Sequence, residues 1–93
     1  MEVIPIEQLE NYLADMKHWF IEGSSITKNY VFPNFKDAIS FVNKIADLAE
    51  KENHHPDIKI FNYRNVTISL STHSAGGVTE KDINFAKSVD SLY

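Results

Sequence analysis

The sequence predicts an α+β fold in which helices cover one face of a single sheet. Its segments follow the order helix, two strands, helix, two strands, helix (α-β-β-α-β-β-α), because apolar residues alternate between helical and strand spacing. Two hairpins separated by an amphipathic helix favour an antiparallel or mixed sheet. No linker or low-complexity segment interrupts the chain, so we expect one domain over residues 1–93.

The first helix and the first hairpin are expected in the N-terminal third. A helix is predicted over residues 5–16, where apolar residues recur at spacings of three and four and Pro5 suits the first helical position. A strand is predicted over residues 17–22, which are rich in aromatic and β-branched residues. A turn signal at residues 23–25 then joins it to a second strand over residues 26–32.

The clearest periodicity lies in residues 35–51, which predict the central helix. Asn34 can cap this helix, and Asp37 three residues later completes a weak capping box. Apolar residues occupy about half of the helical wheel, which is wider than the roughly 100° stripe that packing on one surface requires. The second apolar side predicts either contact with another subunit or a helix seated deeply within a monomer.

A second hairpin and a final helix complete the chain. Strands are expected over residues 58–63 and 66–72, joined by a turn near residues 62–65. The second of these strands alternates apolar and polar residues, so one face should pack and the other should be polar. After a loop over residues 74–77, the run Thr79-Glu80-Lys81-Asp82 resembles a capping box and opens the last helix.

Composition excludes several kinds of protein. The chain has no cysteine, which excludes disulfides, thiolate metal sites and a cysteine nucleophile. Its formal net charge of -4 argues against a nucleic-acid-binding surface. No apolar run approaches the roughly 20 residues that span a bilayer. The first residues also lack the features of a secretory signal, so the cytoplasm is the expected location.

Three of the four histidines, His54, His55 and His73, are candidates for one site. The first two lie between the central helix and the third strand, and the last closes the fourth strand. Imidazoles with a pKa of about 6.5 can give and take protons near neutral pH. Three of them in one pocket would suit a reaction that protonates a leaving group and removes a proton elsewhere.

The predicted hairpin brings these histidines together. In an antiparallel pair the start of the first strand lies beside the end of the second, so the expected turn places Asp57 opposite about Ser71 or Thr72. Neighbouring strands are about 5 Å apart, so His55 and His73 should lie within roughly 10 Å of each other.

Two other interpretations of the histidines stay open. Adjacent histidines at a helix end can cap its carbonyl groups and complement the helix dipole. A three-histidine zinc site of the hydrolytic type is the other interpretation. Adjacent histidines in an extended chain point in different directions, which disfavours metal binding, and no metal is expected.

Three groups of residues together form a specific combination. They are Phe32-x-x-Phe35-x-x-Ala38-x-x-Phe41, then Ala49-Glu50-x-x-Asn53-His54-His55-Pro56-Asp57, and then Val66-x-Ile68-x-Leu70-x-Thr72-His73-x-x-Gly76-Gly77-x-Thr79-x-x-Asp82. On these residues the sequence resembles the pterin-4a-carbinolamine dehydratase family, over about residues 9–90. Trp19 also falls where that family usually has its tryptophan.

The resemblance implies a four-stranded antiparallel sheet with three helices on one face, and assembly into a homodimer or homotetramer. It also implies dehydration of 4a-hydroxytetrahydrobiopterin to quinonoid dihydropterin without metal or organic cofactor. The expected setting is tetrahydrobiopterin recycling for an aromatic amino acid hydroxylase. On the family pattern, His54 and His73 match the acid/base residues and His55 matches the residue that holds the substrate. Glu50 and Asp82 match acidic residues that line or support the substrate site, and Thr72 is expected to bind the substrate.

Two features depart from the family pattern. The turn over residues 62–65 is one residue longer, and an unabsorbed extra residue would slip the strand register and reverse its faces. The position of Asn53 is often acidic in the family, which changes the charge around His54. Two other functions stay open, namely a non-catalytic partner that promotes dimerisation of another protein, and pterin or molybdopterin binding without dehydration.

Overall fold

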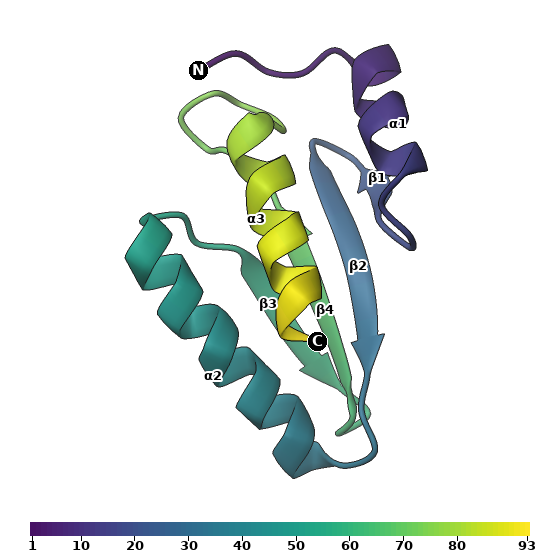
Figure 1. Ribbon diagram of the computed structural model, residues 1–93, viewed down its shortest axis with the longest axis vertical. Coiled ribbons are helices and arrows are strands. Elements are labelled where there is room, and N and C mark those ends of the chain that lie inside the picture. The colour runs from purple at the N-terminus through teal and green to yellow at the C-terminus, as the bar shows by residue number, and fades with distance from the viewer.

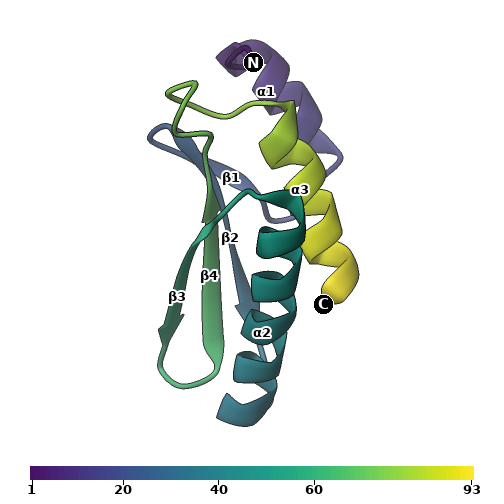
Figure 2. The ribbon, with the colours of Figure 1, turned by 90° about the vertical axis from the view of Figure 1, so that its left-hand side faces the viewer.

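The computed structural model describes all 93 residues, and it confirms the predicted fold class. Four strands form one antiparallel sheet in the order β1-β2-β4-β3. All three helices lie on the same side of this sheet and leave its other face uncovered (Figures 1 and 2). No helix combines the length and the apolar character that crossing a membrane requires.

The elements follow the predicted order along the chain. The helices and strands are α1 (Ile6–Ala14), β1 (Phe20–Glu22), β2 (Ser25–Val31), α2 (Phe35–Glu52), β3 (Asp57–Phe61), β4 (Asn65–Leu70) and α3 (Glu80–Leu92).

The first predicted strand is shorter than expected. Residues 17–19 do not pair, and His18 has a positive φ of 70° in the turn that follows α1. Trp19 is buried, and its indole N–H donates a hydrogen bond to Asp90 of α3 at 3.0 Å. The aromatic character of this segment therefore reflects the packing of a tryptophan against α3, and strand pairing begins only at Phe20.

The core lies between the helices and the two central strands. The alternation in β4 is confirmed, because Val66, Ile68 and Leu70 are fully buried and the residues between them are only half-buried. Ile26 and Tyr30 of β2 share this covered face. The helices contribute buried side chains that include Phe41, Ile45, Ile83, Phe85 and Val89.

The predicted caps are present at both of the longer helices. The side chain of Asn34 accepts a hydrogen bond from the backbone N–H of Asp37 at 2.8 Å. Thr79 and Asp82 form the predicted capping box at the start of α3. Because each cap satisfies N–H groups that the helix itself cannot, both helices begin at defined residues.

The second apolar side of α2 is only partly covered by the single chain. Phe35 is 51% exposed. Ile39 and Val42 are half-buried and Ala46 is exposed. These four residues, separated by four, three and four positions, form a stripe that we call the outer stripe of α2. The helix is therefore not seated deeply within a monomer.

The register predicted for the second hairpin is wrong by two to three residues. Asp57 pairs with Ser69, not with Ser71 or Thr72. Asn62 and Tyr63 both have positive φ, 47° and 52°, and strand pairing extends close to the turn, which comprises residues 62–64 only. The apolar residues of β4 are the buried ones, as predicted, so the extra residue in the turn is absorbed without reversing the faces of this strand.

Candidate functional site

The end of α2 sends the two adjacent histidines in different directions. Asn53 adopts the left-handed conformation (φ 49°, ψ 45°), which asparagine tolerates better than most residues. The N–H of His54 then donates to the carbonyl of Ala49 at 3.1 Å, which closes the helix. As a result His54 is only 7% exposed, whereas His55 lies at the surface.

His54 is held by a carboxylate from α3. Its Nε2 lies 2.5 Å from Oδ1 of Asp82, and Asp82 is fully buried. The imidazole also packs edge-on against the ring of Phe85, with 5.7 Å between ring centroids. Residues 28 positions apart in the chain are thus joined in the interior, and the orientation of the His54 ring is fixed.

The carboxylate of Asp82 accepts two further hydrogen bonds. Its Oδ2 accepts from the backbone N–H of Thr79 at 2.9 Å and from the hydroxyl of Thr72 at 2.8 Å. An ionised carboxylate can only accept hydrogen bonds, so the proton between Asp82 and His54 belongs to Nε2 of His54. Three donors around one buried carboxylate compensate the cost of removing its charge from water.

The second ring nitrogen of His54 remains available for chemistry. Nδ1 makes no hydrogen bond within the chain. Every fully buried side-chain nitrogen or oxygen has a hydrogen-bond partner, so Nδ1 lies where solvent reaches it. With Nε2 protonated and turned inward, Nδ1 presents a lone pair outward in the neutral imidazole and a proton in the imidazolium.

His55 and Glu50 form a separate pair at the surface. Nε2 of His55 lies 2.5 Å from Oε2 of Glu50, and their side chains are 59% and 76% exposed. An exposed pair of this kind contributes little to stability because solvent screens it. The two side chains are therefore free to reorient toward a ligand.

His73 follows directly after Thr72 in a turn that returns to Gly77. The N–H of Thr72 donates to the carbonyl of Gly77 at 2.9 Å, and the isolated bridge between these residues closes the turn. The side chain of His73 is exposed and makes no hydrogen bond within the chain. His73 is thus tethered beside the residue whose hydroxyl binds Asp82.

The predicted site residues therefore fall into three groups. One buried network joins His54, Asp82 and Thr72, an exposed pair joins His55 and Glu50, and His73 borders the network at the surface. The proximity predicted for His55 and His73 stays a prediction. Sequence reasoning identified Thr79 only as a helix cap and gave Phe85 only a core position, because neither pattern reveals what the side chain contacts.

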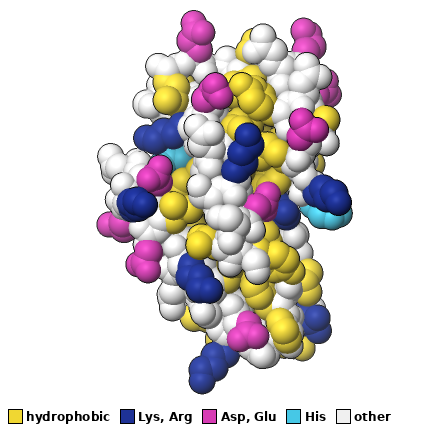
Figure 3. Space-filling model, viewed as in Figure 1, with side chains coloured by type: hydrophobic (Ala, Val, Ile, Leu, Met, Phe, Trp, Pro, Cys, Tyr) yellow, Lys and Arg dark blue, Asp and Glu magenta, His cyan; other side chains and the backbone are white.

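No group of three or more histidine, aspartate or glutamate side chains is arranged to hold a metal ion. Lysine and arginine side chains are interspersed with acidic ones over the helix-covered side and form no basic patch there (Figure 3).

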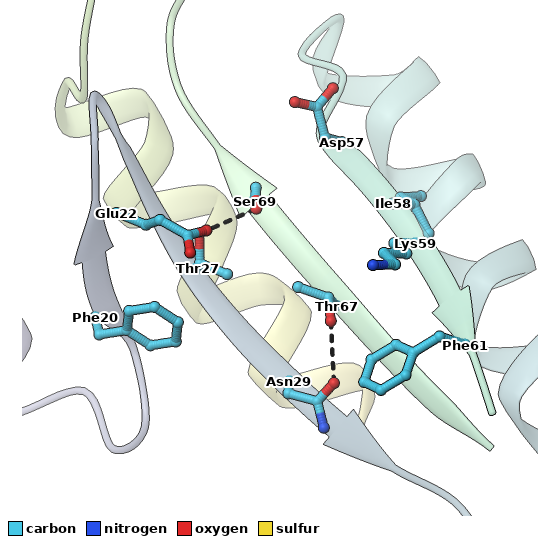
Figure 4. A pocket seen from close by; sticks show the side chains of 10 residues that line it. All are labelled: Phe20, Glu22, Thr27, Asn29, Asp57, Ile58, Lys59, Phe61, Thr67 and Ser69. Atoms are coloured by element: carbon cyan, nitrogen blue, oxygen red, sulfur yellow. Dashed lines mark hydrogen bonds between the residues drawn. The ribbon is translucent and has the colours of Figure 1, made fainter.

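A hollow of about 480 Å³ lies on the uncovered face of the sheet, between Phe20 and Phe61 and over Asn29 and Thr67 (Figure 4). None of the histidines lines this hollow.

A protein-family model described as pterin 4 alpha carbinolamine dehydratase matches residues 2–92. The chain belongs to this family. Curated relatives carry provisional assignments as pterin-4-alpha-carbinolamine dehydratases. The relative from Sulfurisphaera tokodaii is 39% identical over 92 residues, which cover 99% of this chain and 98% of that protein. The relative from Roseiflexus castenholzii is 46% identical over 85 residues, 91% of this chain and 90% of that protein.

Two solved structures of pterin dehydratase-like proteins resemble the chain. A transcriptional coactivator/pterin dehydratase from Brucella melitensis superposes with a TM-score of 0.91 at 31% identity, over 98% of both chains. A pterin dehydratase-like protein identified as a RuBisCO assembly factor in the alpha-carboxysome has a TM-score of 0.70 at 26% identity, over 83% of this chain and 90% of its own. The same pterin dehydratase fold therefore serves proteins described by different roles.

Proposed function

We propose that the protein is a 4a-hydroxytetrahydrobiopterin dehydratase, a hydro-lyase that acts in the cytoplasm in tetrahydrobiopterin recycling. The observation that carries the proposal is the His54 ring, which Asp82 fixes from the buried side while its Nδ1 reaches the surface. Membership of the pterin carbinolamine dehydratase family supplies the substrate class. The expected pathway partner is an enzyme that oxidises tetrahydrobiopterin, such as an aromatic amino acid hydroxylase.

The chemistry needs an acid and a base. The bond between C4a and its hydroxyl oxygen breaks, and a general acid supplies the proton with which the oxygen leaves as water. A general base removes a proton from a ring nitrogen, and the electron pair of that N–H bond forms the new double bond. We assign these two roles to His54 and His73. His55 and Glu50 are assigned to holding the pterin, since both side chains are exposed beside the end of α2.

Turnover of freshly generated carbinolamine by the purified protein tests the proposal. We expect His54→Ala and His73→Ala each to lower kcat by about 10- to 10⁴-fold, the contribution usual for positioned acid/base groups. His18→Ala is the matched control, because His18 is exposed in the turn before β1 at the opposite edge of the sheet from β3. A chelator should leave the rate unchanged. Wild-type rates in both the His54 and His73 variants would refute the assignment.

We also propose that the outer stripe of α2 is the contact between subunits in a homodimer or homotetramer. Apolar residues at spacings of four and three along one exposed face are typical of helices that pair with one another. Val42→Asp, at the centre of the stripe, should convert the protein to monomers in analytical ultracentrifugation. The control is Asn43→Asp, at an exposed position of the same helix. A wild-type protein that sediments as a monomer would contradict this proposal.

A second candidate function is protein binding without catalysis. The descriptions of the two structural neighbours, one as a transcriptional coactivator and one as a RuBisCO assembly factor, favour it. A third candidate, pterin or molybdopterin binding without dehydration, is separated by the same assay. Tight pterin binding without turnover would favour the third candidate, and neither binding nor turnover would favour the second.

A further inference from the structure

We propose that Thr72 and Thr79 are positioning residues for His54, which act through a directed chain of hydroxyl protons on the Asp82 carboxylate. The proposal rests on the proposed function, because it concerns the orientation of an acid/base histidine. It gives Thr72 a different role from the one that the family pattern predicts, since Thr72 then supports the site from within and does not bind the substrate through its hydroxyl.

The direction of the chain follows from counting protons. Thr72 Oγ1 lies 2.8 Å from Asp82 Oδ2, and the carboxylate can only accept, so the single hydroxyl proton of Thr72 points at Asp82. Thr72 Oγ1 also lies 2.8 Å from Thr79 Oγ1. Because the proton of Thr72 is already used, Thr79 must donate in this second hydrogen bond. The order is therefore Thr79 to Thr72 to Asp82.

A competing acceptor does not disturb this order. The hydroxyl of Thr79 also lies 3.0 Å from the sulfur of Met1, but a thioether sulfur is a weak acceptor compared with a hydroxyl oxygen. The backbone N–H of Lys81 donates to Thr79 Oγ1 at 3.3 Å, which leaves the Thr79 proton free to point at Thr72. Hydrogen bonds that run in one direction polarise one another and strengthen together.

Because the network is buried, the loss of a donor to Asp82 affects His54. Thr72 is 6% exposed, and Thr79 and Asp82 are fully buried, so solvent has little access to replace a lost donor. The Asp82 carboxylate keeps its position only while its donors hold Oδ2 in place. Since Oδ1 of the same carboxylate holds Nε2 of His54, a change at Oδ2 alters the orientation of the imidazole.

The two threonines are expected to differ in a graded way. We expect Thr72→Val, which removes a donor from Asp82, to lower kcat about tenfold with KM nearly unchanged. Thr79→Val keeps its backbone N–H bond to Asp82, so its effect should be smaller. Because Thr79 acts through Thr72, the double variant should be no slower than Thr72→Val alone. Thr72→Ser and Thr79→Ser keep the hydroxyls and should restore most of the rate.

Asn34→Ala provides a matched control for the loss of a helix cap. Asn34 caps α2 through a 2.8 Å hydrogen bond and contacts none of the site residues, so this variant should lower stability without changing kcat. Independent, additive effects of the two threonines would overturn the proposal. So would a Thr72→Val variant that loses pterin affinity and keeps its kcat, since that result indicates direct substrate contact.

Nuclear magnetic resonance of the histidine rings tests the proposal without any substrate. In the wild type, His54 should hold its proton on Nε2, and that proton should exchange slowly with water. Thr72→Val should shift this resonance and speed its exchange, whereas Asn34→Ala should not. If Thr72→Val does not fold, the His54 resonance of Thr79→Val is compared with that of the wild type instead. An unchanged His54 resonance would overturn the proposal, and a shifted resonance in a protein without dehydratase activity would support it while the proposed function fails.

Discussion

Replacing Asp82 by asparagine tests whether the carboxylate fixes the protonation state of His54. In the wild type, Oδ2 accepts from Thr72 and Thr79 and Oδ1 accepts from Nε2 of His54. An asparagine can keep its amide oxygen at the Oδ2 position, where Thr72 and Thr79 donate. Its NH₂ group must then face His54. An NH₂ group only donates, so Nε2 must give up its proton and Nδ1 must carry it.

The contacts of Asp82 determine the losses of stability and of activity that we expect for this variant. Two of the three hydrogen bonds to residue 82 keep their donors and the third reverses direction, so the loss of stability should be the difference between charged and neutral hydrogen bonds, about 1–2 kcal/mol. The loss of activity should be larger. In serine-protease triads the same exchange lowers kcat about 10⁴-fold because the histidine is held in the wrong tautomer, so we expect about 10²- to 10⁴-fold here.

Two measurements on Asp82→Asn separate these effects. Thermal or denaturant unfolding gives the change in stability, and single-turnover kinetics with fresh carbinolamine give the change in the chemical step. The ¹⁵N resonances of the His54 ring report directly which nitrogen carries the proton. A variant that keeps the wild-type tautomer, or that keeps the wild-type rate with the tautomer switched, would refute the reasoning.

Two further predictions concern His55 and Tyr30. His55→Ala should weaken pterin binding in a calorimetric titration and leave the unfolding midpoint almost unchanged, because the side chain is 59% exposed and its pair with Glu50 is screened; unchanged affinity would remove His55 from the site. Burial, followed by the hydrogen bond to Asp90, raises the pKa of Tyr30 well above its ordinary value. The folded protein therefore keeps the Tyr30 proton where the unfolded chain loses it, so stability should fall as pH rises above about 10. Ultraviolet absorbance should show Tyr30 ionising only as the protein unfolds, and reversible ionisation of every tyrosine in the folded protein would contradict this.

Local patterns were sufficient for the fold, and the resemblance to the family was sufficient for the composition of the buried network. The apolar spacing in α2 and the alternation of Val66, Ile68 and Leu70 depend on which residues face the core, and the sequence expresses that directly. The family motif likewise named His54, Thr72 and Asp82, which the structure joins.

The other features could not be predicted from the sequence, because they depend on backbone conformation and tertiary contacts. Whether His54 or His55 turns inward depends on the left-handed conformation of Asn53, which the residue type permits but does not require. The hairpin register depended on positive φ at both Asn62 and Tyr63, and tyrosine gives no signal for such a conformation. The strand expected over residues 17–22 begins only at Phe20, because an aromatic run looks the same whether it pairs with a strand or packs against a helix.

Titration of the wild-type protein with a tetrahydropterin, followed through its histidine ring resonances, tests most directly whether distant histidines share one site. The account predicts that the resonances of His54, His55 and His73 shift together with a single dissociation constant. His18, in the turn before the opposite edge strand, should stay unchanged. The account would be contradicted if the His73 resonance stayed unchanged at saturating pterin. It would also be contradicted if that resonance shifted with a different dissociation constant from the His54 resonance.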